Sequence, residues 1–160
     1  MAQVVDEKGA KQVYQDLLDK ICYAYFENDF DAFQDAMHMP HHYRTETDAQ
    51  QIDTADQLLR AFHCFRDYFV GLGVTDFIRT CTGAALLGPD KIAASHMTEL
   101  LCNGTRLRQP YEVWAIVKKV DGIWKVASSE NAISDTSWQA HAFRQGAEFK
   151  HKPLQGRTDR

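Results

Sequence analysis

One histidine and one glutamate stand on segments whose residue alternation is typical of β-strands, and they are the first candidates for chemistry. His96 lies in residues 91–102, on the same strand face as Thr98 and several apolar residues. Glu112 lies in residues 106–119, where both strand faces are largely apolar. A neutral imidazole in such surroundings can act as a base or as a hydrogen-bond donor, and burial favours the protonated form of a carboxyl group. We therefore predict His96 and Glu112 as catalytic residues, with a core histidine and an arginine-paired glutamate as the structural alternatives.

Aromatic and amide side chains supply further candidates. Tyr14 and Tyr25 share the apolar stripe of a helix predicted over residues 10–27. The Tyr25 hydroxyl would stabilise an enolate, or the ring would serve only as a core aromatic with its hydroxyl at the rim. Which face of the last strand points inward stays open, because a single bulge reverses the alternation. We predict Tyr25 as a third catalytic residue and, as ligand-binding residues, Tyr14, Tyr43, Trp114 and Asn131.

The sequence does not indicate a metal or cofactor site. His41 and His42 are adjacent, and neighbouring residues of a strand point to opposite faces, so they are poorly placed to share one ion. The four cysteines are widely spaced, with no C-x-x-C pair. The chain also contains no glycine-rich phosphate loop and no G-x-S-x-G elbow. We expect no metal and no cofactor.

Three helices are predicted in the first half of the chain to position these side chains. They cover residues 10–27, 30–37 and a segment that begins at Thr54 and ends near Gly71. Thr54 and Gln57 have the spacing of a capping box, in which each side chain satisfies an amide at the start of a helix. Short strands are predicted over residues 41–46 and 50–52.

The second half changes to the two-residue period of strands. Four long strands are predicted, over residues 75–86, 91–102, 106–119 and 123–133. The segments between them contain Gly, Asn or Asp, which accept the positive φ of tight turns. This pattern predicts an α+β fold, in which three N-terminal helices pack in a curved antiparallel sheet of four long and one or two short strands. Residues 134–149 are expected to dock as an extra helix or strand.

Composition narrows the class of protein. The chain has 160 residues, which suits one domain, and its formal net charge of −4 leaves no basic surplus for nucleic acid. No apolar run approaches the roughly 18–20 residues of a membrane helix, and the first residues lack the pattern of an export signal. Widely spaced cysteines suit reduced thiols. We expect a cytoplasmic protein that binds neither nucleic acid nor membrane.

Three segments resemble the NTF2-like superfamily, which includes ketosteroid isomerases, SnoaL-type cyclases and scytalone-type dehydratases. They are the helix end at residues 25–31, the helix start at residues 54–58 and the hairpin at residues 121–126. The resemblance spans about residues 8–135 and leaves residues 136–160 as a partly ordered extension. It implies a sheet curved into a cone with a pocket at its open end, and homodimers formed through the outer sheet face. It also implies that His96 points inward and that Glu112 stands where the isomerases keep a carboxylic acid donor.

Three functions remain open. The first is a mainly hydrophobic pocket for a small organic molecule, with proton transfer of the isomerase, cyclase or dehydratase type. The second is a non-catalytic module that dimerises or binds a ligand. The third is the small subunit of a ring-hydroxylating oxygenase, which the same fold would allow.

Overall fold

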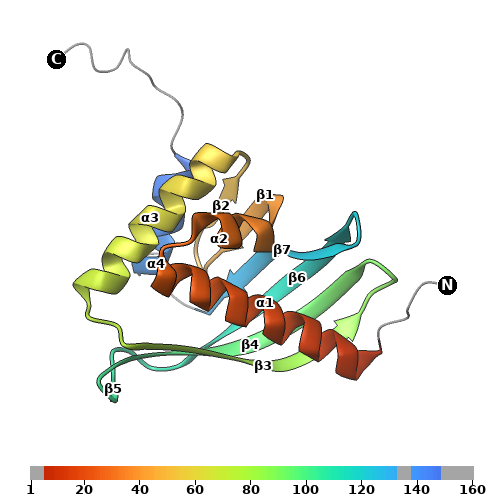
Figure 1. Cartoon of the computed structure of the whole chain (residues 1–160), viewed down its shortest axis with the longest axis horizontal. Helices are drawn as coiled ribbons and strands as arrows, with labels where there is room; N and C mark the ends of the chain where they lie inside the picture. The colour runs from red at the N-terminus through yellow and green to blue at the C-terminus, as the bar shows by residue number, and fades with distance from the viewer. Residues whose placement is uncertain (1–5, 133–137, 149–160) are drawn as a thin grey trace, which may run out of the picture.

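Helices cover the concave face of one curved sheet in the computed structural model, which describes residues 6–132 and 138–148 (Figure 1). The helices are α1 (Glu7–Glu27), α2 (Phe30–Ala36), α3 (Ala55–Gly71) and α4 (Trp138–Ala147). The predicted α+β class and the three N-terminal helices are confirmed. The extra element expected near the C-terminus is the helix α4, while residues 149–160 of the predicted extension lie outside the described residues.

The sheet contains seven strands. Six follow the order β2-β1-β7-β6-β4-β3, and β5 pairs with β4. Their bounds are β1 (Met37–Arg44), β2 (Ala49–Ile52), β3 (Asp76–Leu86), β4 (Lys91–Cys102), β5 (Thr105–Arg106), β6 (Tyr111–Val120) and β7 (Ile123–Asn131). The strand predicted over residues 106–119 is therefore two strands, because Pro110 lacks the N–H that a continuous ladder would need.

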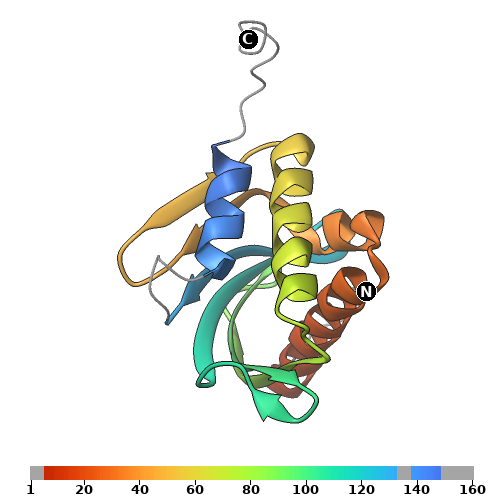
Figure 2. The same ribbon diagram turned by 90° about the vertical axis from the view of Figure 1, so that its left-hand side faces the viewer.

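One strand pair differs from the predicted antiparallel sheet. β1 runs parallel to β7, with Tyr43 opposite Ser129, while the other pairs are antiparallel. The sheet is therefore mixed. Register shifts interrupt β3 between Cys81 and Gly83, and β7 between Val126 and Ser128. Such bulges increase local twist, which suits the curvature seen in Figure 2.

Local sequence signals explain where the elements begin and turn. The Thr54–Gln57 capping box is present at the start of α3, as predicted. Asn103–Gly104 and Asp121–Gly122 connect their strands with positive φ at both residues. Tight hairpins require that conformation, and these residue types adopt it at low cost.

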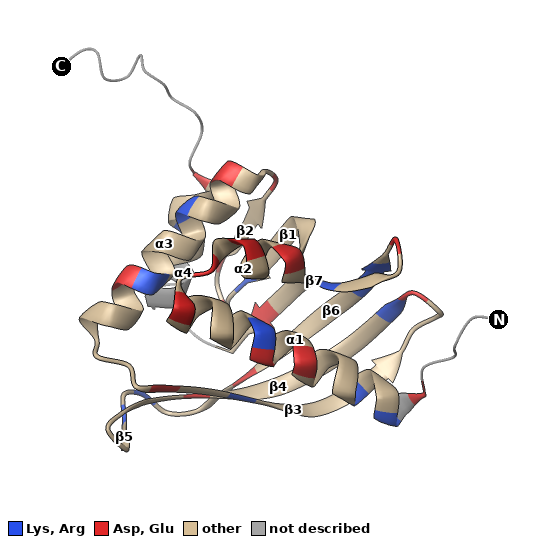
Figure 3. Cartoon of the chain, in the orientation of Figure 1, with Lys and Arg blue, Asp and Glu red and all other residues tan. Residues whose placement is uncertain are grey.

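An aromatic core joins the helices to the sheet. Tyr25 stacks on Phe65 with ring centroids 4.2 Å apart and on Phe62 at 5.3 Å. The central parts of β4 and β6, residues 92–98 and 113–117, carry no charged residue, and most charges lie on helix surfaces and towards strand ends (Figure 3), with Arg79 of β3 as an exception. Among the described residues, no helix is both long enough and apolar enough to cross a bilayer.

Candidate functional site

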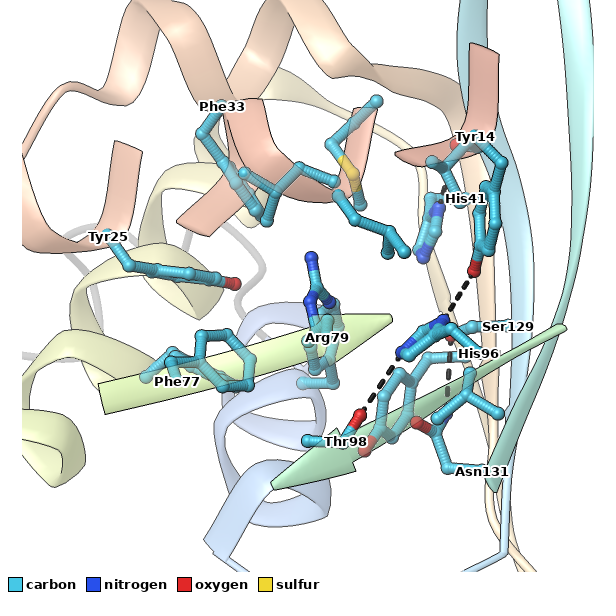
Figure 4. Close-up of a pocket in the computed structure, with 18 of the residues that line it drawn as sticks. Tyr14, Tyr25, Phe33, His41, Phe77, Arg79, His96, Thr98, Ser129 and Asn131 are labelled. Carbon is cyan, nitrogen blue, oxygen red and sulfur yellow. Dashed lines mark hydrogen bonds between the residues drawn. The ribbon is translucent and has the colours of Figure 1, made fainter. Parts of the chain in front are cut away.

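A cavity of about 70 Å³ lies inside the curve of the sheet, between α1 and the inner strand faces (Figure 4). Aromatic side chains from helices and strands make up much of its wall, namely Tyr14, Tyr25, Phe33, Tyr43, Phe65, Phe77, Tyr111 and Phe143. An engineered apolar cavity of about 150 Å³ holds benzene, and this space is about half that size, so it suits an organic molecule smaller than benzene or a few waters. Polar groups from α1, β1, β3, β4 and β7 also reach it.

A hydrogen-bonded chain of three side chains crosses one wall of the cavity. Tyr14 Oη lies 2.7 Å from His96 Nδ1, and His96 Nε2 lies 3.1 Å from Thr98 Oγ1. All three residues are buried. A neutral imidazole has one N–H donor and one acceptor nitrogen, so both of its nitrogens are used in either tautomer. These two hydrogen bonds connect α1 to the middle of β4.

Burial sets the protonation states of Tyr14 and His96. It lowers the pKa of His96 to about 2, and the nearby positive charge of Arg79 acts in the same direction. Burial also raises the pKa of the Tyr14 hydroxyl far above its ordinary value. At neutral pH the site therefore contains a neutral imidazole and a neutral phenol.

A second buried histidine lines the cavity from β1. His41 Nδ1 lies 3.2 Å from the Val126 carbonyl oxygen. A carbonyl can only accept, so Nδ1 carries the proton and Nε2 carries the lone pair. Burial lowers the pKa of His41 to about 4. His42 is exposed, as the alternation of adjacent strand residues predicts.

The cavity also contains a cation. Arg79 enters from β3 and its guanidinium carbon lies 4.8 Å from the centre of the Phe77 ring. Nε and Nη2 of Arg79 are buried, and neither has a hydrogen-bond partner among the described residues. Figure 4 shows the Tyr25 hydroxyl pointing towards Arg79. Burial raises the pKa of Tyr25 and the Arg79 charge opposes that shift, so the two side chains interact.

Ser129 and Asn131 form the wall contributed by β7. Asn131 Nδ2 donates to Ser129 Oγ and to the Arg44 carbonyl, each at 3.2 Å. The bulge at Ala127 brings Val126, Ser129 and Asn131 to the inner face. This bulge therefore decides which residues of β7 face inward, which the sequence alone left open.

Comparison with known proteins gives matches at the level of structure. No protein-family model and no curated protein matches the chain. An NTF-2 like protein of unknown function from Shewanella oneidensis MR-1 has a TM-score of 0.59 at 12% identity, covering 76% of this chain and 98% of that chain. A domain of unknown function with a cystatin-like fold from Nostoc punctiforme PCC 73102 has a TM-score of 0.60 at 11% identity, covering 94% and 93%. LinA has a TM-score of 0.55 at 12% identity, covering 76% and 83%.

The chain has the NTF2-like cone fold. The fold that the resemblance implies is therefore confirmed. Identities this low carry the fold and no activity.

The NTF2-like cone brings five of the seven predicted site residues to the cavity wall. These are Tyr14, Tyr25, Tyr43, His96 and Asn131. Their proposed roles in binding or catalysis remain predictions.

The inward position predicted for Glu112 and Trp114 is wrong. In the β4–β6 ladder His96 lies opposite Val113, and Glu112 lies opposite Met97 on the other face. Trp114 is 47% exposed on that outer face. Both faces of β6 are largely apolar, so composition did not distinguish them. The structure therefore does not bring His96 and Glu112 together.

Two basic side chains of the cavity wall, Arg79 and His41, were not among the predicted site residues. Polarity alone would place Ile78 rather than Arg79 inside, yet Ile78 is 43% exposed and Arg79 lines the cavity. His41 was considered only as half of a metal pair. Its position in a strand-like segment was the available signal. Among residues 6–132 and 138–148 there is no group of three or more side chains of the types that ligate metals.

Proposed function

We propose that this NTF2-like protein binds a small organic molecule inside its cone. The observation that carries this proposal is the cavity itself, where an aromatic wall surrounds a few polar side chains from separate elements. Small-molecule sites typically have this composition, with apolar surface for affinity and a few polar groups for orientation. The two buried histidines and the inward-pointing arginine are costly to bury, which favours a site over a simple core.

The geometry supports binding better than proton transfer by His96. A general base works best with a pKa near the operating pH, and the pKa of His96 is about 2. Both ring nitrogens are also engaged by Tyr14 and Thr98. With Glu112 on the outer face, the predicted acid partner is absent from the wall. We therefore assign His96 the role of holding Tyr14 and Thr98 at the cavity.

A cavity-filling substitution tests the proposed site. Val113 lines the cavity and is 2% exposed, so Val113→Phe would place a ring in the empty space. Two small neutral probes, propionamide and isobutyramide, are titrated into labelled protein and followed by ¹H–¹⁵N NMR. We expect shifts at cavity-lining residues of the parent, and at least a tenfold weaker response in Val113→Phe.

Ile116→Phe is the matched control, because Ile116 lies on the outer face of the same strand. It should bind both probes as the parent does. If Val113→Phe binds the probes as well as the parent does while retaining a folded spectrum, the proposed site is wrong.

We further propose that the outer sheet face pairs with a second copy of the chain. The helices leave this face bare (Figure 1), and it presents Trp114 together with the half-buried Ile116 and Met97. An exposed apolar patch on a sheet favours association. The four cysteines carry free thiols, which supports a place in a reducing compartment such as the cytoplasm.

A further inference from the structure

Arg79 is a charged group in an otherwise uncharged cavity wall. Among the described residues that line the cavity there is no Asp or Glu, and Arg79 carries the only permanent charge. The structure also shows no ion pair between Arg79 and any described carboxylate. The contact with the Phe77 ring compensates the charge in part, since cation–π contacts are weaker than an ion pair with hydrogen bonds.

The two nitrogens without partners define one edge of the guanidinium. Nε and Nη2 present two roughly parallel N–H bonds, the geometry that matches both oxygens of a carboxylate. Both nitrogens are almost fully covered, while Arg79 as a whole is half-buried. Burying such a group without a partner is costly, and an anion on this edge would remove the cost. Because both nitrogens are covered, a carboxylate in the cavity would require Arg79 to rotate its side chain so that this edge faces the ligand.

The backbone of Arg79 is held in place by α1. The Gln15 side chain donates from Nε2 to the Arg79 carbonyl at 2.9 Å and accepts from the Cys81 N–H at 2.8 Å. Both bonds lie beside the register shift of β3. The strand is therefore fixed to the helix at the point where the cation enters the cone.

Neutral donors surround the same space. Tyr25 points towards Arg79 in Figure 4, and its burial keeps the phenol protonated, so its O–H can donate to an anion. The charge of Arg79 also lowers the pKa values of Tyr14 and His96, so both side chains lie close enough to interact with it. A single fixed cation with neutral donors suits a monoanion better than a phosphate dianion.

We infer that the ligand of this cavity is a small organic carboxylate whose charged group is held by Arg79. This inference rests on the proposed small-molecule site and names the chemical class that the site prefers. The aromatic wall would then surround the uncharged part of the ligand, and the carboxylate would pair with the Nε–Nη2 edge.

Matched acids and amides test the inference with the complete chain. Propionate and isobutyrate are compared with propionamide and isobutyramide by ¹H–¹⁵N NMR titration at constant ionic strength. We expect each acid to bind the parent at least tenfold more tightly than its amide. Equal or tighter binding of the amides would overturn the carboxylate and leave the small-molecule site standing, whereas binding of none of the four would remove both.

Two variants assign the preference to Arg79. In Arg79→Met the preference for acids should disappear, while Arg106→Met should keep it, because Arg106 pairs with Glu99 on the surface. Removal of an uncompensated charge should also raise the Tm of Arg79→Met by a few degrees without ligand. An unchanged acid preference in this variant, or a Tm lowered by several degrees, would show that Arg79 is not the carboxylate partner.

Discussion

His96 occupies its position as a neutral side chain, and this links the stability of the protein to pH. In the unfolded chain a histidine titrates near pH 6.5, whereas burial lowers the pKa of folded His96 to about 2. Below pH 6.5 the unfolded state therefore binds more protons than the folded state. The contribution of neutral His96 to the unfolding free energy is complete above pH 6.5 and is lost as the pH falls towards 2. His41, whose pKa is about 4, adds to the same trend between pH 6.5 and 4.

The first prediction concerns the slope of the unfolding free energy against pH. Each buried neutral histidine should contribute about 1.4 kcal/mol per pH unit to the loss of unfolding free energy. In His96→Gln the slope between pH 6.5 and 4.5, measured by urea denaturation, should therefore be smaller by that amount. His63→Gln is the control, because His63 is exposed, and it should retain the parent slope. An unchanged slope in His96→Gln would contradict a neutral, buried His96.

The resemblance to the NTF2-like superfamily implied the inner face of β4 correctly. Alternation grouped His96 with Thr98, the resemblance turned that face inward, and both residues are buried. The pattern in β3 misleads, because Arg79 faces inward and Ile78 outward. Which face is buried there depends on α1 and the curvature of the sheet, neither of which is encoded in the two residues themselves.

At the scale of elements, local signals predicted boundaries well and distant pairings poorly. The capping box at Thr54 and the turns at residues 103–104 and 121–122 act through backbone conformation alone, so they are readable in sequence. The parallel pairing of β1 with β7 joins residues more than eighty positions apart. No local pattern specifies that contact, which is why an entirely antiparallel sheet was predicted.

The packing of α4 on α3 depends on a glycine. A Cβ atom at Gly146 would lie 2.7 Å from the Ala61 Cβ and 2.7 Å from the Gln57 carbonyl oxygen, so only glycine permits this approach. The same helix brings Phe143 to the cavity, where its ring stacks on Tyr43 with centroids 4.1 Å apart. Docking of α4 therefore completes one side of the cavity wall.

Gly146→Ala should loosen this contact. We expect a loss of about 1–3 kcal/mol in unfolding free energy, typical of an overpacked contact, and faster amide hydrogen exchange in α4 than in the parent. Gly71→Ala is the matched control, because Gly71 ends α3 with open space around it, and it should be neutral or stabilising by up to about 1 kcal/mol. Equal effects of the two substitutions would mean that the close approach of α3 and α4 does not matter.

At the scale of the whole molecule, the two faces of the sheet differ in how far the helices cover them. The concave face is covered by helices and encloses the cavity, while the convex face stays open (Figure 2). Trp114, at 47% exposed, lies on this open face and next to Glu130 of β7. A large aromatic side chain in such a position is typical of the centre of an interface.

Trp114→Glu should therefore break the proposed pairing of two chains. We expect the parent to sediment with twice the 18.3 kDa mass of one chain at micromolar concentration, and the variant to sediment as a single chain. The reason is that the new carboxylate beside Glu130 would lose its hydration in the interface and would be repelled by the Glu130 charge. Val70→Glu serves as the control, since Val70 is 70% exposed on α3, away from the convex face, and should remain paired. A parent that sediments as a single chain at 100 times higher concentration would exclude the pairing, and the exposed tryptophan would then need another partner. Because the cavity lies on the concave side of the sheet, loss of pairing should leave probe binding unchanged, so the two proposals can be tested separately.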